Sequence, residues 1–241
     1  MKLVCVLAVH NEEAYLPYSL GPLGELGCLV VVVLDRCVDA SEKLVKRHLR
    51  NVELVFKDSG CWKNSCAEAK SLGCDVAKKF GADLILMTDA DVLLDVEAVQ
   101  KAKCTLESSD YQVVVLPYGQ YSLFGSFMSR VSNEAQNLFA SLTRKLKIHP
   151  VRFGIYLGKA DAVRLEDKTS EFDYLQKNVK TTWVPTKSLH LRPRLDVLSQ
   201  MEHGVARTEM SQHNLMKALI FSISTFQPFT LAGYLKAKMK K

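Results

Sequence analysis

Apolar runs that alternate with helix-like segments limit most strongly how this chain of 241 residues can fold. The run CLVVVVLD, at 28–35, holds no polar residue before its last position. A short run without alternation is typical of a strand that is covered on both faces. Strands are therefore expected in the first half at 2–9, 28–35, 51–57, 83–89 and 111–118. The third of them alternates in polarity, which favours a place near an edge of the sheet.

Segments with helical spacing lie between these strands, at 13–23, 41–49, 65–80 and 96–107. Strand–helix–strand units with short connections form a mostly parallel sheet with helices on both faces. Ligands of such sheets bind beyond the carboxyl ends of the strands. The candidate site is therefore expected where the strands end, at HNEE (10–13), DRCVD (35–39), DSGCWKNS (58–65) and DAD (89–91).

The second half of the chain is less regular. Helices are expected at 124–144 and 171–178, and strands at 152–159, 181–185 and 188–192. From residue 211 onward the pattern predicts two helices that are broken around Pro228. We expect one domain over 1–210, and a helical, basic segment over 211–241 that packs on this domain or lies at a membrane surface.

Composition narrows the class of protein. The net charge of +6 suits anionic partners such as a nucleotide or a membrane surface, but it is too small and too scattered to indicate nucleic acid. The seven cysteines include no CxxC pair, which favours reduced thiols in the cytoplasm over a structural zinc site. No run of about 18 apolar residues is present, so no membrane-spanning helix is expected. The N-terminus is better explained as a first strand than as a signal peptide.

Two aspartates one residue apart follow the apolar run at 84–87. Like charges in a half-buried place are unfavourable unless a cation or hydrogen bonds compensate them. Asp89 and Asp91 suit Mg²⁺ or Mn²⁺, because such sites use one or two carboxylates together with substrate phosphates. The alternative is a turn in which both side chains bind local backbone groups. Asp95 is best explained as the N-cap of the next helix.

The other strand ends leave two interpretations open. Asn11 and Glu12 either contact a ligand or fix a turn and begin a helix. Lys63 either neutralises a phosphate or is a solvated surface lysine. Asp35 is expected to accept hydrogen bonds from a base or ribose, whereas Asp39 with Glu42 resembles a capping box.

Taken in order, these motifs resemble family 2 of the nucleotide-sugar glycosyltransferases, which have the Rossmann-like GT-A fold. The resemblance covers roughly the first 100 residues: LAVHNEEAYLPYSL, VVVVLDRCVDASEKLV, a loop and helix with a lysine, and ADLILMTDADVLLD. The chain departs from the family pattern where Ala8-Val9 replaces Pro-Thr. It departs again at 34–37, where LDRC replaces Asp-Asp-Gly-Ser, so that one aspartate remains.

The resemblance implies roles for the residues at the strand ends. Asn11 and Glu12 would shape the nucleotide pocket, and Asp35 would face the base. Lys63 would lie near the donor. Asp89 would contact the ribose or the metal shell, and Asp91 would coordinate the metal.

In the second half the family has an acidic pair that opens a helix, followed by a strand that ends near a histidine. Here SEFDYL supplies Glu171 and Asp173, with Asp173 the first choice as general base and the segment LED (165–167) as an alternative placement. His190 is either a third metal ligand or a pocket or core histidine. Arg192 and Arg194 either bind the leaving diphosphate or an acceptor phosphate, or form a solvated basic loop.

The function implied is metal-dependent inverting transfer of a sugar from a nucleotide-diphospho-sugar to a hydroxyl or phosphate acceptor, with a lipid phosphate or a saccharide as candidates. A carboxylate would act as general base, and Mn²⁺ or Mg²⁺ as cofactor. One alternative is a nucleotidyltransferase, although HNEEAYLP lacks the glycine-rich phosphate loop that such enzymes use. Another is a nucleotide-binding protein that has lost catalysis. The lysine-rich C-terminus suits peripheral contact with the inner face of a membrane, or else a packed helix with a basic end.

Overall fold

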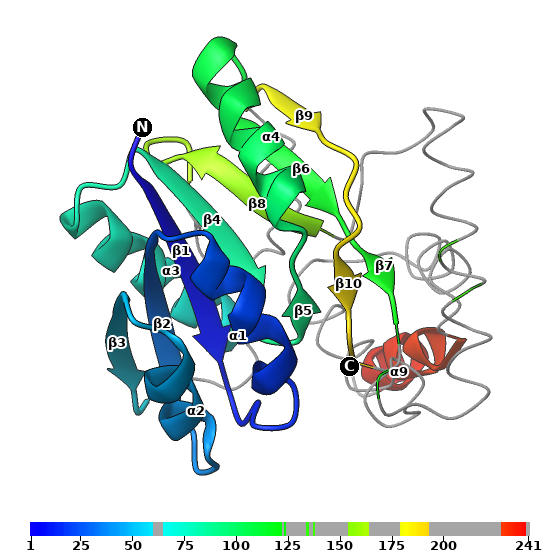
Figure 1. The fold of residues 1–241 in the computed structure, drawn as a ribbon. Coiled ribbons are helices and arrows are strands. Elements are labelled where there is room, and N and C mark those ends of the chain that lie inside the picture. The colour runs from blue at the N-terminus through cyan, green and yellow to red at the C-terminus, as the bar shows by residue number, and fades with distance from the viewer. Residues whose placement is uncertain are drawn as a thin grey trace. The chain divides into compact units, whose positions relative to one another are not determined.

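The computed structural model describes residues 1–59, 65–121, 123, 134, 137, 154–163, 179–192 and 228–239 (Figure 1). The chain divides into two compact units. One holds residues 1–118 and 151–189, and the other holds 119–150 and 190–241. The expected domain limits, 1–210 and 211–241, stay a prediction.

A seven-stranded sheet forms the first unit. Its strand order is β3-β2-β1-β4-β8-β6-β9, and β8 runs antiparallel to both of its neighbours, whereas the other pairs described are parallel. The strands are β1 (Leu3–Val9), β2 (Leu29–Asp35), β3 (Val52–Lys57), β4 (Leu84–Asp89), β6 (Val113–Pro117), β8 (Gly154–Lys159) and β9 (Thr181–Trp183). This order confirms the mostly parallel sheet, and β3 lies at an edge as its alternating sequence predicted.

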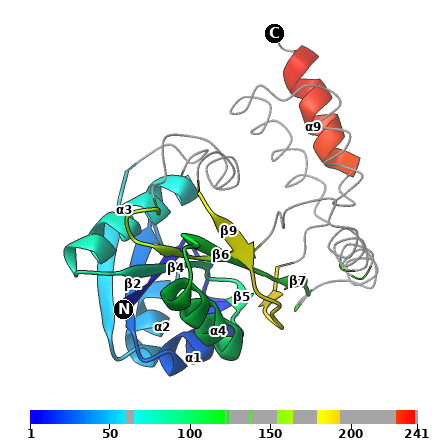
Figure 2. The ribbon, with the colours of Figure 1, turned by 90° about the horizontal axis from the view of Figure 1, so that it is seen from above.

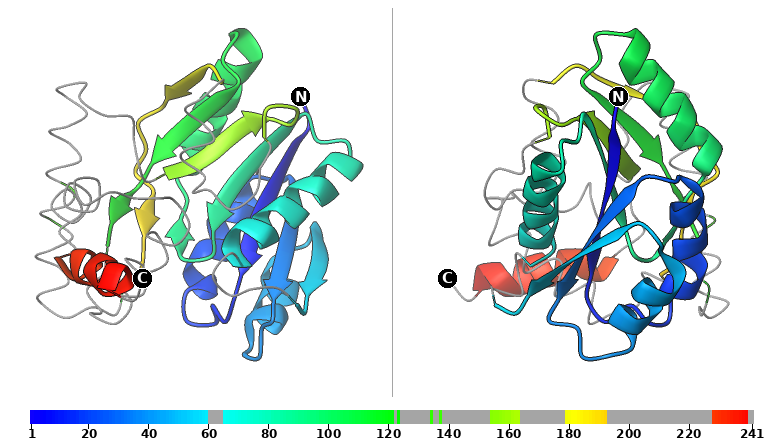
Figure 3. Two further views of the ribbon diagram at one scale, coloured as in Figure 1. Left: turned by 180° about the vertical axis from the view of Figure 1, so that it is seen from behind. Right: turned by 60° about the vertical axis from the view of Figure 1, so that its left-hand side comes forward.

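Helices cover both faces of this sheet. They are α1 (Leu16–Glu25), α2 (Ser41–His48), α3 (Ser65–Lys79) and α4 (Val96–Ser108). Figures 2 and 3 show α3 on one side of the sheet and α1 and α4 on the other. A two-residue strand, β5 (Val92–Leu93), lies between β4 and α4 in the sequence. All four helices overlap the segments expected from the sequence.

Successive side chains of each central strand are buried on alternate faces of the sheet. In β1, Cys5 and Leu7 pack with residues of α1, α2 and α4, whereas Val4 and Val6 pack with α3. All four side chains are fully buried. Burying one such side chain stabilises the fold by roughly 1.5–3 kcal/mol, so a strand that gains this on both faces must be apolar throughout. This is the physical origin of the unbroken valine runs.

Helix α3 lies unusually close to the sheet at Gly73. A Cβ atom built at Gly73 would lie 2.4 Å from Cγ1 of Val6 and 3.1 Å from Cγ2 of Val33. The missing side chain therefore sets the distance between α3 and the strands β1 and β2. Any larger residue must push the helix away from the sheet.

The other described elements are short. β7 (Gly119–Gln120) and β10 (Leu189–His190) are hydrogen-bonded neighbours, and Tyr121 N donates to the carbonyl oxygen of His190 at 2.8 Å. Helix α9 (Pro228–Met239) begins at the proline where the sequence predicted a break, which suits proline because the first helical N–H has no partner in the helix. Of the helix expected at 124–144 only residues 134 and 137 are described, and both are helical. The helix expected at 171–178 and the one expected before Pro228 lie outside the described residues.

Helix α9 carries apolar and basic side chains at its surface. Tyr234 is buried, whereas Leu235, Lys236, Lys238 and Met239 are exposed. Over the residues that the structure describes, no helix has both the length and the apolar character needed to cross a bilayer.

We predict that Gly73→Ala destabilises the protein by about 1–3 kcal/mol, because the new methyl group overlaps Val6. The free energy of unfolding in urea measures this. Gly24→Ala in α1 is the matched control, since a Cβ there meets its nearest neighbour at 3.9 Å. An equal effect of the two substitutions would contradict the role assigned to Gly73.

Candidate functional site

The strand ends of the predicted site meet at one edge of the sheet. The parallel register pairs Ala8 with Asp89, and Asp35 with Lys57. Because β1, β2, β3 and β4 are parallel, the residues that follow them emerge on the same side (Figure 1). The structure thus brings together the HNEE, DRCVD and DAD segments. In the segment DSGCWKNS (58–65), residues 58 and 59 follow β3 at the same edge, and Ser65 begins α3.

Asp35 is a buried carboxylate with two cationic partners. Its side chain is 4% exposed, and it accepts a hydrogen bond from Nε of Arg36 at 2.9 Å and another from Nζ of Lys57 at 3.3 Å. Lys57 also forms an ion pair with Glu68 of α3 at 3.2 Å. Burying one carboxylate is costly unless such partners compensate it, and these two cations do so.

Arg36 was not singled out from the sequence. Its φ of +50° lies in the left-handed region, which favours glycine and is uncommon for other residues. It stands where the family pattern has glycine, and that replacement was the available signal. The guanidinium of Arg36 folds back onto Asp35 and donates hydrogen bonds to its carboxylate. The nucleobase that Asp35 is expected to contact would therefore meet a carboxylate that already accepts hydrogen bonds from Arg36.

Asn11 fixes the turn after β1. It also has a positive φ, +54°, and asparagine tolerates this region better than most residues. Its Oδ1 accepts a hydrogen bond from Val38 N at 2.8 Å, and Glu12 N donates to Oγ of Ser41 at 2.9 Å. These bonds join the loop after β1 to the loop after β2. They bear out the turn interpretation of Asn11 and leave its expected ligand contact a prediction.

Asp39 extends this link between the two loops. Its carboxylate accepts hydrogen bonds from Glu13 N and Ser41 N, both at 3.0 Å, and the carboxylate of Glu13 accepts one from Ala40 N at 2.9 Å. Partial burial raises the pKa of Asp39, but the hydrogen bonds from Ser41 and Glu13 outweigh it and hold the pKa below its usual value.

These contacts correct two expectations. The capping box of Asp39 and Glu42 is wrong, because the N-cap of α2 is Ala40 and the carboxylate of Glu42 pairs with Lys46. Helix α1 begins at Leu16 rather than near Glu12 or Glu13. Both glutamates donate their N–H groups to the neighbouring loop, and Leu16 N donates to the carbonyl oxygen of Glu12 in the first turn.

The DAD turn (89–91) lies at the carboxyl end of β4. Asp89 is 34% exposed and forms an ion pair with Nζ of Lys70 at 2.8 Å, and Asp91 is only 7% exposed. Lys70 belongs to α3 and is itself 5% exposed. Lys70 was not singled out from the sequence, although it lies within the buried stripe of α3 that includes Ala69 and Gly73.

The carboxylates of this turn fit a divalent cation. Hard cations such as Mg²⁺ and Mn²⁺ take oxygen ligands, and one or two carboxylates suffice where phosphate oxygens supply the others. Among the described residues no group of three histidine, cysteine or acidic side chains could hold a metal by itself. Asp91, with Asp89 one residue away, offers carboxylate oxygens of the kind that such a cation takes, and their role as metal ligands stays a prediction.

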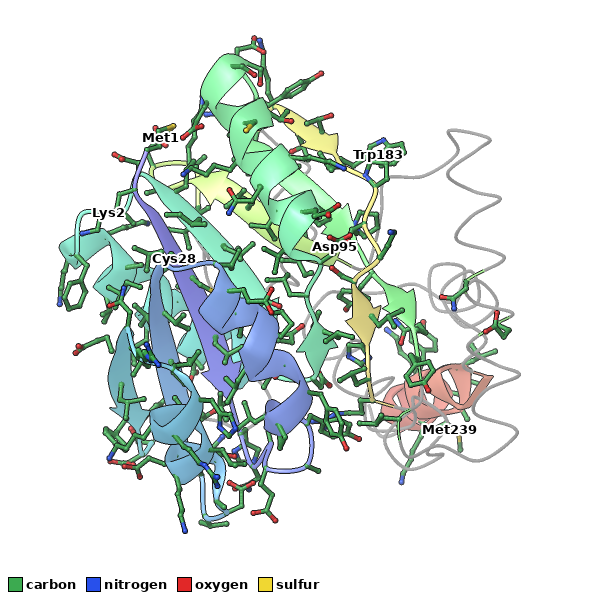
Figure 4. The ribbon with its side chains drawn as sticks, in the orientation of Figure 1. Met1, Lys2, Cys28, Asp95, Trp183 and Met239 are labelled. Atoms are coloured by element: carbon green, nitrogen blue, oxygen red, sulfur yellow. The ribbon has the colours of Figure 1, made fainter. Side chains whose placement is uncertain are left out.

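Asp95 caps α4, as predicted. Its Oδ1 accepts a hydrogen bond from Ala98 N at 3.1 Å and its Oδ2 accepts one from Lys187 N at 2.8 Å. Figure 4 shows Asp95 at the lower end of α4. Partial burial raises its pKa, but the hydrogen bonds from Lys187 and Ala98 hold it below the usual value. The chain after the DAD turn is thus anchored to the loop that precedes β10.

The remaining predicted residues are not tested by these contacts. His190 is buried, and it belongs to the second unit, as does the exposed Arg192. Their roles toward a metal or donor stay predictions. Five further assignments lie outside the described residues: Lys63, Glu171, Asp173, Arg194 and the segment 165–167.

Four of the described cysteines, Cys5, Cys28, Cys37 and Cys104, carry free thiols. The expectation of reduced thiols in the cytoplasm stays a prediction. Burial raises the pKa of Cys5 well above its usual value, and burial also raises the pKa of Cys28 and Cys37. Thiols of this kind are poor nucleophiles, so none of these three suits covalent catalysis.

Comparison with known proteins identifies the fold. No family model and no curated protein matches the sequence. Among solved structures, glucosyl-3-phosphoglycerate synthase from Mycobacterium tuberculosis, in complex with Mn²⁺, UDP and glucosyl-3-phosphoglycerate, is 18% identical, with a TM-score of 0.55 over 88% of this chain and 79% of that one. S. aureus TarS 1–349 in complex with UDP-GlcNAc is 14% identical, with a TM-score of 0.52 over 95% of this chain and 73% of that one.

At these identities the likeness concerns the fold alone. Both neighbours are glycosyltransferases of the GT-A type. The chain therefore has the GT-A fold, as the resemblance of its first 100 residues implied.

We predict that Asp39→Asn lowers the free energy of unfolding at pH 7 by about 1–2 kcal/mol, because two hydrogen bonds to a charged acceptor weaken. The folded-state pKa is depressed, so the stabilisation by Asp39 is present above its unfolded pKa and is lost as the pH falls through the folded pKa. The difference between parent and variant should therefore shrink below about pH 4. Urea titrations between neutral and acidic pH measure it, with exposed Asp75→Asn as control. A gap that stays constant with pH would contradict the assignment.

Proposed function

We propose that this protein is a metal-dependent inverting glycosyltransferase that uses a nucleotide-diphospho-sugar. The observation that carries the proposal is the Asp89–Asp91 turn at the carboxyl end of β4, within a GT-A sheet whose neighbouring strand ends meet at the same edge. Ligands of open α/β sheets bind at this edge. A diphosphate needs a cation there, and the turn supplies the carboxylates for one.

The donor class is supported by what the neighbours bind. The mycobacterial synthase has been solved with UDP and either Mn²⁺ or Mg²⁺, and TarS with UDP-GlcNAc. We infer a nucleotide-diphospho-sugar donor for this chain as well. The base would lie near Asp35, with Asn11 and Glu12 in the pocket wall and with Lys63 and Arg192 near the donor phosphates.

Asp91 would hold the cation, with Asp89 beside it and His190 as a further ligand. When bound, Mg²⁺ or Mn²⁺ neutralises the charge that develops on the leaving diphosphate. The buried position of Asp91 suits this role, because a partly desolvated carboxylate interacts more strongly with a cation than an exposed one does.

The general base would be Asp173 or, failing that, Glu171. In an inverting transfer this carboxylate takes the proton of the acceptor hydroxyl while the acceptor oxygen attacks the anomeric carbon and the bond to the diphosphate breaks. A phosphate acceptor is already ionised near neutral pH. Transfer of the sugar to a phosphate would therefore not depend on Asp173 or Glu171.

We predict that Asp91→Ala lowers turnover by about a hundredfold or more, the usual cost of removing one charge-stabilising group. A thermal-shift screen with Mn²⁺ and a panel of nucleoside diphosphates first identifies the nucleobase of the donor. Release of the matching nucleoside diphosphate then measures turnover. Asp75→Ala, an exposed acid on α3, is the control. Equal turnover of the parent and Asp91→Ala would exclude the metal role.

The same assay compares Asp173→Ala with Glu171→Ala. Loss of the general base should lower transfer to a hydroxyl acceptor by about 10²–10⁴-fold. Full activity of both variants would show that neither Asp173 nor Glu171 is the general base.

We further propose that α9 contacts an anionic membrane surface. Its exposed Leu235 and Met239 are one turn apart, and Lys236 and Lys238 are exposed beside them. On a surface of this kind, the apolar side chains can enter the membrane interface and the lysines can attract anionic headgroups.

Cosedimentation with vesicles tests this contact. The parent should bind vesicles with anionic lipid, less so at high salt, and Lys236→Glu/Lys238→Glu should not bind. The control is Lys43→Glu/Arg47→Glu, which makes the same charge change on α2. Loss of binding in both double variants, or no binding by the parent, would reject α9 as the contact.

A further inference from the structure

The strand order places the end of β1 at a particular point of the sheet. From β1 the chain moves outward through β2 to β3, and it then returns to the other side of β1 with β4. Helices α1 and α2 pack on one face of the sheet and α3 packs on the other (Figure 3). The direction of winding thus reverses between β1 and β4. Ligands of open α/β sheets bind beyond the carboxyl ends of the strands at such a switch point.

His10 is the first residue after β1, and its side chain is exposed. Nδ1 of its ring lies 2.6 Å from the backbone carbonyl oxygen of Asp35, at the end of β2. A carbonyl oxygen only accepts hydrogen bonds, so Nδ1 carries the proton and donates to it. In the neutral imidazole Nε2 is then the acceptor. The backbone at the end of β2 thereby fixes the tautomer of His10.

The second ring nitrogen of His10 is directed away from that carbonyl group. Nδ1 and Nε2 point to different sides of the five-membered ring, and the carbonyl oxygen of Asp35 lies on the Nδ1 side. Within the part of the chain that the structure describes, no group hydrogen-bonds Nε2. The exposed imidazole thus offers an acceptor of fixed tautomer at the edge of the sheet where ligands bind.

Asp35, the residue expected to contact the nucleobase, already has partners. Its carboxylate accepts hydrogen bonds from Arg36 and Lys57, and its backbone carbonyl oxygen accepts one from His10. A base that lies near Asp35 therefore also lies near the imidazole of His10. We propose that His10 is a specificity-determining residue whose Nε2 accepts a hydrogen bond from the nucleobase of the donor. This inference rests on the proposed function, because it concerns the donor of that site.

The chemistry of the bases decides which donors fit this acceptor. The ring nitrogen at the centre of the Watson–Crick edge carries a proton in uracil and in guanine. The corresponding ring nitrogen of cytosine and of adenine has a lone pair, which would face the lone pair of Nε2. A site built to bind an N–H group discriminates against an analogue that lacks it. His10 therefore selects uracil or guanine over cytosine and adenine.

The test is nucleotide binding to the intact protein, measured by isothermal titration calorimetry with UDP, GDP, CDP and ADP in the presence of Mn²⁺. The titrations are made at pH 8, where a histidine side chain is neutral and can accept a hydrogen bond. UDP or GDP should bind about tenfold more tightly than CDP and ADP, which corresponds to one hydrogen bond that the competitors cannot form. The comparison of UDP with GDP then identifies which of the two bases the donor carries.

Three substitutions separate the acceptor from the other properties of the ring. His10→Phe keeps an aromatic ring without an acceptor, and the preference should fall to about twofold or less. His10→Asn places an N–H group near the position of Nδ1 and nothing at that of Nε2, so the bond to Asp35 is kept and the preference should still be lost. His10→Gln places its amide oxygen near the position of Nε2 and should keep most of the preference.

His48→Phe is the matched control. Nδ1 of His48 also bonds a backbone carbonyl oxygen, that of Leu44 at 2.8 Å, and the side chain is exposed on α2. The nucleotide affinities of this variant should equal those of the parent. Far-ultraviolet circular dichroism checks that each variant is folded. If His10→Phe does not fold, the comparison of His10→Asn with His10→Gln still decides the question.

Three results would overturn the assignment. The first is a parent protein that binds CDP or ADP as tightly as UDP and GDP, or that binds none of the four. The second is His10→Phe with the same preference as the parent, because the ring would then act by stacking alone. The third is a preference that His10→Asn keeps and His10→Phe loses, because the bond to Asp35 would then be what matters.

The assignment and the proposed function fail in different ways. The predicted order of nucleotide affinities, found in a protein that transfers no sugar from any donor, supports His10 and contradicts the transferase. Sugar transfer that depends on Mn²⁺, with a nucleotide preference that no substitution of His10 changes, supports the transferase and contradicts the role of His10.

Discussion

The burial of the central sheet on both faces is the constraint on which the first unit depends. Helices α1, α2 and α4 cover one face, and α3 covers the other so closely that Gly73 has no room for a side chain. Strands β1, β2 and β4 can carry polar groups only where they leave these layers. The concentration of acidic residues at the strand ends is therefore a result of packing before it is a matter of chemistry.

Each of these acidic residues is compensated in its own way. Asp35 is held by the cations of Arg36 and Lys57, Asp89 by Lys70, and Asp39 by backbone N–H groups. Buried or half-buried carboxylates need such partners, because desolvation alone would drive them to the neutral form. At this end of the sheet the loops after β1 and β2 are therefore tied to each other, and each carboxylate is held by its partners.

Local sequence patterns predicted the regular elements well and their ends less well. Strand β2 differs by one residue from its predicted range, and β3 was recognised as an edge strand from its alternation. The start of α1 was missed because Glu12 and Glu13 look like first-turn residues but bond to the neighbouring loop instead. The capping box at Asp39 failed for the same reason. A backbone N–H that finds a partner in another loop is invisible to a pattern within one segment.

By itself the sequence determined the layered architecture and the position of Asp89 and Asp91 in a turn at a strand end, where the candidate site is predicted, since hydrophobic periodicity and chain order are properties of the sequence alone. The tertiary structure decided which groups compensate those charges. Lys70 lies nineteen positions before Asp89 and Lys57 lies twenty-two after Asp35, so their pairing depends on how α3 and β3 pack on the sheet. Short-range spacing cannot reveal such pairs, because ion pairs form wherever packing brings the charges within a few ångströms.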